Sequence, residues 1–327
     1  MSVVRVPQAL AAALLLGASL GGCGLFSHPS DPRYRPPENL LEVVAVLRQH
    51  VPDDTYRFEP ARDFTGRNIY RASLLRLENI EHAYADALQA GHMDDVIAFS
   101  KGRALERLRA FDLAATNYRR AAEYQGELAQ EARRSASICD SLDEAARIGF
   151  DADRPDDAPG ESPAAIPRDP EGVVQASQQR TALLEALQAE TTGTHYEAVI
   201  REEIERAEMA RARYFVATRR ATPDGDVRAL AELQQLVVHN QESKLRSRHM
   251  LELADLYASL AEEYVVKHPP EGLLFDPASF QELVDSAARL YEAVGKQDGT
   301  PEKLEASRRL EAFLAFTLRV DRDRFTQ

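Results

Sequence analysis

Two cysteines are the side chains most able to do chemistry in this chain of 327 residues. Cys139 lies on the apolar face of a predicted helix, where a cysteine is usually a small core residue rather than a reactive thiol. Cys23 directly follows two glycines at the end of a short apolar run. We therefore predict packing at Cys139 and look for chemistry at Cys23.

The rest of the sequence carries no recognised catalytic or ligand-binding motif. It lacks HExxH, GxSxG, a phosphate-binding loop, a dinucleotide glycine fingerprint and a paired-cysteine metal motif. No two histidines are spaced as helical ligands, and each is interpreted as a surface or helix-end residue: His28, His50, His82, His92, His195, His239, His249 and His268. We expect no catalytic residue, no cofactor and no metal.

Neighbouring acids are the remaining candidates for chemistry. Asp94-Asp95, Glu202-Glu203 and Glu262-Glu263 fit solvated helix faces, and Glu202 and Arg206 have the spacing of an ion pair on the outside of a helix. A carboxylate pair for glycosidic cleavage can nevertheless assemble from distant positions. An enzyme therefore stays open as an alternative.

The beginning of the chain has the composition of a secretory signal. Arg5 precedes an apolar run from Ala9 to Leu20, which is shorter than the ~20 residues of a membrane-spanning helix. The four residues Leu20-Gly21-Gly22-Cys23 resemble the lipobox of bacterial lipoproteins. The resemblance implies that Cys23 carries a diacylglycerol thioether, with acyl chains such as palmitate, and becomes the mature amino terminus.

Attachment through this lipid predicts a place in the cell envelope. Two or more acyl chains anchor a protein stably. Gly24, rather than Asp, follows the cysteine, and in proteobacterial lipoproteins this implies export to the outer membrane, facing the periplasm. The alternatives are an ordinary signal peptide with a chance cysteine, or a buried first helix.

Composition limits both the partners and the fold. The formal net charge of −13 argues against nucleic-acid binding, which requires a positively charged surface. It also argues against electrostatic binding to anionic lipid headgroups. Ala, Leu, Glu and Arg dominate, glycine is sparse and tryptophan is absent. This composition favours an all-α fold.

Changes in composition divide the chain into segments. Prolines and polar residues mark an extended tether, and an acidic, proline-rich stretch marks a linker between two helical halves. We predict a signal peptide, a tether, a first helical half, a linker and a second helical half at residues 1–22, 23–37, 38–150, 151–172 and 173–327.

One helical pair carries more information than its periodicity. Gly102, Leu105, Ala114, Tyr118 and Ala121 combine small and large residues on two successive helices. This pattern resembles the tetratricopeptide repeat, in which small residues let the two helices approach and an aromatic residue fills the gap to the next hairpin. The resemblance implies stacked helical hairpins.

The repeat pattern is incomplete. Ala98 stands where a large residue is expected, and Gly126 stands where a proline closes the standard repeat. A second, more widely spaced echo near the end of the chain consists of Ala254, Tyr257, Ala287, Tyr291 and Val294. A generic helical bundle is the alternative.

These observations predict a lipid-anchored scaffold that binds other envelope proteins. Helical repeats present extended surfaces on which a partner segment lies as a helix or an extended peptide. The alternative is a cell-wall (peptidoglycan) enzyme on an all-helical scaffold, which requires a deep cleft with converging acids. A solute-binding lipoprotein is disfavoured because the sequence lacks alternating strands and helices.

Overall fold

The computed structural model describes residues 68–90, 93–149 and 169–325. Within these ranges the regular elements are helices: α3 (Ile69–Ala83), α4 (Ala85–Ala90), α5 (Asp94–Arg107), α6 (Phe111–Glu123), α7 (Ala129–Arg147), α8 (Pro170–Thr191), α9 (Tyr196–Thr218), the 3₁₀ helix η3 (Arg219–Ala221), α10 (Gly225–His239), α11 (Arg246–Lys267), α12 (Pro277–Gly295) and α13 (Pro301–Phe325). The predicted all-α fold is confirmed. The lipobox-like residues, the predicted tether and most of the predicted linker lie outside the described residues.

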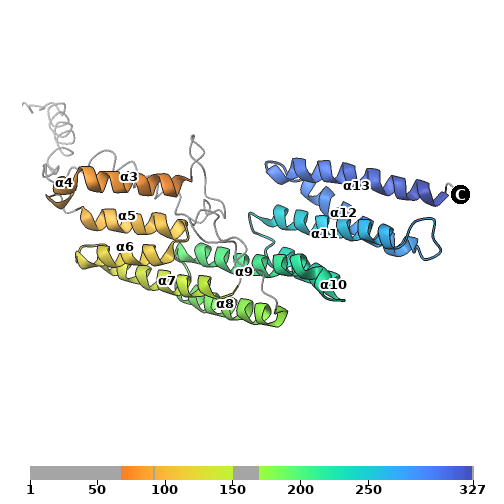
Figure 1. Cartoon of the computed structure of the whole chain (residues 1–327). Coiled ribbons are helices and arrows are strands. Elements are labelled where there is room, and N and C mark those ends of the chain that lie inside the picture. Colours follow the sequence, from red (N-terminus) through yellow and green to blue (C-terminus); the bar gives the residue numbers. More distant parts are fainter. Residues whose placement is uncertain (1–67, 91–92, 150–168, 326–327) are drawn as a thin grey trace, which may run out of the picture.

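The helices form a stack of hairpins. Each helix from α5 onward packs on the next one in sequence, through to α12 on α13. Helices two apart also touch, as α3 does with α5 and α11 with α13. Figure 1 shows the resulting elongated body, with α3 to α7 toward one end and α11 to α13 toward the other. This packing is the arrangement expected of stacked helical hairpins.

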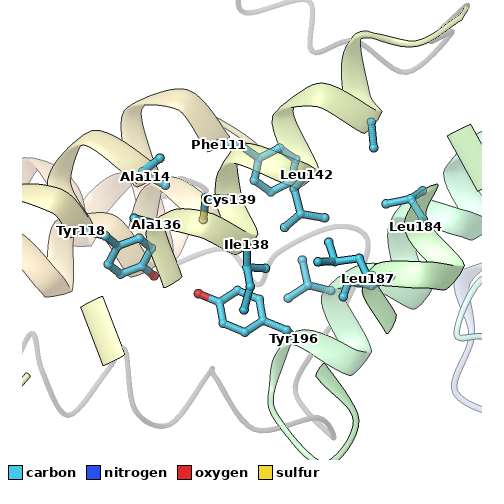
Figure 2. Packing of buried hydrophobic residues seen from close by; sticks show 14 of the residues in the cluster. Phe111, Ala114, Tyr118, Ala136, Ile138, Cys139, Leu142, Leu184, Leu187 and Tyr196 are labelled. Atoms are coloured by element: carbon cyan, nitrogen blue, oxygen red, sulfur yellow. The ribbon is translucent and has the colours of Figure 1, made fainter. Parts of the chain in front are cut away.

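The hydrophobic core passes along the stack from one group of helices to the next. One cluster joins α5 to α9, a second joins α8 to α11, and a third joins α11 to α13. Figure 2 shows the first cluster, in which α6 and α7 side chains meet Leu184, Leu187 and Tyr196 of α8 and α9. Residues from both predicted halves therefore share one core.

Helix starts follow the expected capping chemistry at two places. The side chain of Asp276 accepts hydrogen bonds from the backbone N–H groups of Ala278 and Ser279, and Pro277 occupies the first helical position. Asp169 and Pro170 start α8 in the same way. Helix α8 therefore begins at residue 170, within the stretch predicted as linker up to residue 172.

Two local predictions are wrong. The helical spacing of apolar residues in the sequence predicts one helix over residues 66–90, but the helix breaks at Tyr84, which lies between α3 and α4. Tyr84 is exposed instead of buried on the helix face. The sequence also predicts Asp112 as the cap of the helix that ends near Tyr124, but Ala110 occupies the cap position of α6. Asp112 lies in the first turn, where its carboxylate interacts favourably with the helix dipole.

None of the helices in the described part of the chain is both long enough and apolar enough to cross a membrane.

Candidate functional site

The predicted repeat residues meet in the α5–α6 hairpin. Gly102 lies against the ring of Tyr118, so that a Cβ at residue 102 would lie 2.7 Å from the ring carbon Cε1. Ala114, Tyr118 and Ala121 are completely buried, and Leu105 is also buried. The hydroxyl of Tyr118 donates a 2.8 Å hydrogen bond to Glu106 on the facing helix. A glycine is required here because the aromatic ring occupies the volume of any side chain.

The second predicted echo has a related arrangement in the α11–α12 hairpin. Ala254, Ala287, Tyr291 and Val294 are buried. The hydroxyl of Tyr291 donates a 2.7 Å hydrogen bond to Asp255 of α11, just as Tyr118 of α6 bonds to an acid of α5. In both hairpins, an aromatic residue on the second helix thus joins packing to one hydrogen bond with the first.

Replacing Gly102 with alanine is expected to destabilise the protein by about 1–2 kcal/mol. Overpacking costs about 1–3 kcal/mol, and the better helix propensity of alanine returns up to about 1 kcal/mol. Urea unfolding followed by circular dichroism measures the change. The matched control is Gly295→Ala, whose Cβ would lie 3.4 Å from Ser307. Equal stability changes in the two variants would contradict the packing argument.

Glu203 of α9 is the centre of a buried ionic group. Its carboxylate is 3% exposed and accepts two hydrogen bonds from Arg109, at 2.6 and 2.9 Å, and one from Arg180 at 3.0 Å. Burial alone would raise the pKa of Glu203, but the guanidinium groups, Arg109 foremost, hold it below its usual value. This carboxylate ties α8 and the α5–α6 turn to α9.

Arg109 reaches Glu203 from an unusual backbone conformation. Its φ of 59° lies in the left-handed region, which costs a non-glycine residue roughly 1 kcal/mol or more. The residue stands in the short turn between α5 and α6. The bidentate ion pair offsets this backbone cost and fixes the direction of the turn toward α9.

A cleft lies beside this ionic group on the other side of α9. It has a volume of about 400 Å³ and is lined by α9 on one wall and by residues 238–244, which are the end of α10 and the connection to α11, on the other. Helix α9 contributes Ala198, Arg201, Glu202 and Glu205. The cleft is therefore bounded by one long helix and one helix connection.

Carboxylates of α9 hold the second wall in place. Oε1 of Glu205 accepts a 2.6 Å hydrogen bond from Ser243 and lies 2.6 Å from Nε2 of the buried His249. One turn further along α9, Glu208 lies 2.9 Å from Nδ1 of His239 and accepts a 2.7 Å hydrogen bond from Asn240. The end of α10, the connection and the start of α11 are thus fixed to α9 at four points, two of them in the connection itself.

The polar groups of the cleft divide into those that hold the fold and those that face outward. Glu202 pairs with Arg107 at 3.4 Å, and its burial raises the pKa of its carboxyl against the opposing effect of that arginine. Within the described residues, the side chains of Arg201, Gln241 and Glu242 make no hydrogen bond or ion pair. The buried carboxylates are engaged by neighbouring helices, while a cation, an amide and an anion are available to a ligand.

Several polar residues were wrongly placed by their chemical type alone. Glu203, predicted on a solvated face, is buried, and the partly buried Glu202 pairs with Arg107 of α5. His249, predicted as a surface or helix-end residue, lies in the first turn of α11 but is fully buried. Their spacing held the missing signal: residues 199, 203, 207 and 210 share the buried face of α9, and residues 249, 253 and 256 share that of α11.

The cysteine predictions have different outcomes. Cys139 is fully buried in the cluster shown in Figure 2, and burial raises the pKa of its thiol. Its predicted role as a core residue is confirmed. Cys23 lies outside the described residues. In the parts of the chain that the structure describes, no three His, Cys, Asp or Glu side chains form a group able to hold a metal ion.

Comparison with known proteins adds no relative. No family model matches the sequence, and no curated protein matches it.

Proposed function

We propose that this protein is a lipid-anchored envelope lipoprotein that binds a segment of another envelope protein in the cleft between α9 and the α10–α11 connection. The supporting observation is the set of available side chains in that cleft. Arg201, Gln241 and Glu242 offer a cation, an amide and an anion, and Val238, which is 60% exposed, offers an apolar contact. A polypeptide segment carries partners for all four.

The architecture of the binding wall favours recognition over catalysis. The carboxylate of Glu205 is engaged by a serine and a buried histidine, and that of Glu202 by Arg107. These groups make the cleft rigid before a partner arrives, which lowers the entropic cost of binding. The tetratricopeptide-like hairpins on either side supply the scaffold, and the proposed lipid on Cys23 supplies attachment to the outer membrane, facing the periplasm.

Site-specific photocrosslinking in living cells tests the proposal. A photoreactive residue at Gln241, in the cleft, is expected to capture one envelope protein. The same residue at Gln178, exposed on α8, is the matched control and should capture none. Cys23→Ala should remove both the acyl chains, as seen by mass spectrometry, and the crosslink. Equal capture from positions 178 and 241 would count against the cleft.

The same crosslink measures the contribution of Arg201. Arg201→Glu is expected to lower its yield by about fivefold or more, the effect of losing one significant interface residue. Arg133→Glu, at an exposed arginine of α7, changes the net charge equally and should leave the yield unchanged. An identical effect of the two substitutions would show that overall charge, and not the cleft, governs capture.

A further inference from the structure

Two adjacent leucines project from the loop between α11 and α12. Leu273 is completely exposed and Leu274 is 79% exposed. The loop extends beyond the ends of the two helices it joins, close to the carboxyl-terminal end of α13 (Figure 1). Single exposed leucines are common on protein surfaces, but two neighbours at the tip of a projecting loop form an apolar point that water solvates poorly.

The loop holds these leucines in a fixed conformation. The N–H of Gly272 donates a 2.8 Å hydrogen bond to the carbonyl of Pro269. Phe275, the next residue after the leucines, is buried against Tyr264 and Phe280. The backbone on both sides of the two leucines is therefore held by contacts with the rest of the protein. Little conformational entropy is lost when the leucine side chains bind an apolar partner.

Charges of both signs lie near the tip. Lys267 ends α11, Glu271 and Asp276 lie in the loop, and Arg324 of α13 lies over the ring of Phe275 at 5.5 Å. Arg324 also pairs with Asp321 of α13 at 3.8 Å, so these groups supply no excess of positive charge for binding an anionic surface. The chain as a whole is acidic, at −13, which opposes approach to an anionic surface.

We infer that Leu273 and Leu274 insert into the apolar region of a bilayer with little net surface charge. A convex apolar tip can insert into a deformable lipid bilayer without a preformed site, whereas a protein partner would need a complementary pocket. The bilayer is also within reach, a step that depends on the proposed lipid at Cys23: the 44 residues between Cys23 and Asn68 span at most about 150 Å. The tip is then a second membrane contact that orients the body on the surface.

Tryptophan fluorescence tests this contact directly, because the chain contains no tryptophan. Leu274→Trp, made in the full chain, is expected to shift its emission to shorter wavelength with phosphatidylcholine vesicles and to be quenched by brominated phosphatidylcholine. Leu318→Trp, at a leucine of α13 that is 69% exposed, is the matched control and should show neither change. Identical behaviour of the two variants would overturn the proposal.

Two further arms sharpen the test. Adding Leu273→Ser to Leu274→Trp should raise the lipid concentration for half-maximal quenching by about tenfold, the effect of losing one inserted leucine. Replacing the lipid with phosphatidylglycerol should weaken the response. A Leu274→Trp signal that changes with an envelope extract but not with vesicles would assign the tip to a protein and overturn the proposal.

The outcome is separable from that of the proposed anchor. Mass spectrometry reports whether Cys23 is acylated, while the fluorescence titration reports the tip at any lipid concentration. An acylated protein without quenching at residue 274 would retain the anchor and reject the tip. An unacylated protein with quenching at residue 274, but not at 318, would reject the anchor and retain the tip.

Discussion

Replacing Glu203 with alanine is expected to lower the free energy of unfolding by about 3–5 kcal/mol, the cost of removing one partner from a buried ion pair. Arg180 is 2% exposed, and its guanidinium bonds to Glu203. Without this carboxylate, a buried positive charge loses its compensation and cannot recover hydration. Urea unfolding measures the loss.

An exposed ion pair provides the comparison. Arg119 and Asp140 pair across α6 and α7 with both side chains about half exposed, so Asp140→Ala should cost about 1 kcal/mol or less. A loss below about 1 kcal/mol for Glu203→Ala would mean that water enters the cluster. Removing the arginine as well, in Glu203→Ala with Arg180→Met, should restore part of the stability because no uncompensated charge is then buried.

Lowering the pH from about 6.5 to 4 is expected to cost about 3 kcal/mol of stability through His195. Burial, assisted by Arg103, lowers the pKa of this imidazole to about 4 despite the opposing charge of Glu106. Nη1 of Arg103 lies 3.1 Å from Nδ1 of His195. That nitrogen therefore accepts, and the neutral ring keeps its proton on Nε2, facing Glu106 at 3.4 Å.

The direction of the pH effect follows from which state binds the proton first. In the unfolded chain, histidine takes up a proton near pH 6.5, whereas in the folded chain His195 does so only near pH 4. The free energy of unfolding is therefore not reduced by His195 above about pH 6.5, and it falls as the pH drops from about 6.5 to 4. The magnitude corresponds to the shift in pKa at about 1.4 kcal/mol per unit.

Comparison with a variant isolates this contribution from other titrating groups. His195→Gln should show a shallower fall in unfolding free energy between pH 6.5 and 4 than the wild type. His82→Gln, at an exposed position of α3, should retain the wild-type slope. Parallel pH profiles for the wild type and His195→Gln would show that His195 is protonated in the folded state.

Local sequence features predicted much of the helical framework. Asp276 and Pro277 start α12 as expected, since a carboxylate accepts the first free N–H groups and proline fits the first turn. The resemblance to the tetratricopeptide repeat placed Gly102 and Tyr118 on the two helices of one hairpin, and the structure brings these two residues into contact. Such features are readable because each depends on residues close together in the chain or on one helical hairpin.

The cleft could not be predicted from local sequence features. Its walls come from α9 and from residues 238–244, and they are joined by contacts such as that between Glu205 and His249, 44 residues apart. The presence of a glutamate in the sequence does not predict whether its carboxylate will contact water, an arginine or a histidine. The partner is decided by which residues of α10, α11 and their connection pack against α9.

The sequence by itself determined that this protein is all-helical and that hairpins such as α5–α6 can pack closely, and it carries the lipobox-like pattern at Cys23 on which attachment is proposed. Tertiary structure alone decided that the adjacent acids Glu202 and Glu203 meet different arginines, Arg107 and Arg109. The physical reason is that helical periodicity fixes which side chains share a face, whereas the partner of that face is set by packing between distant segments.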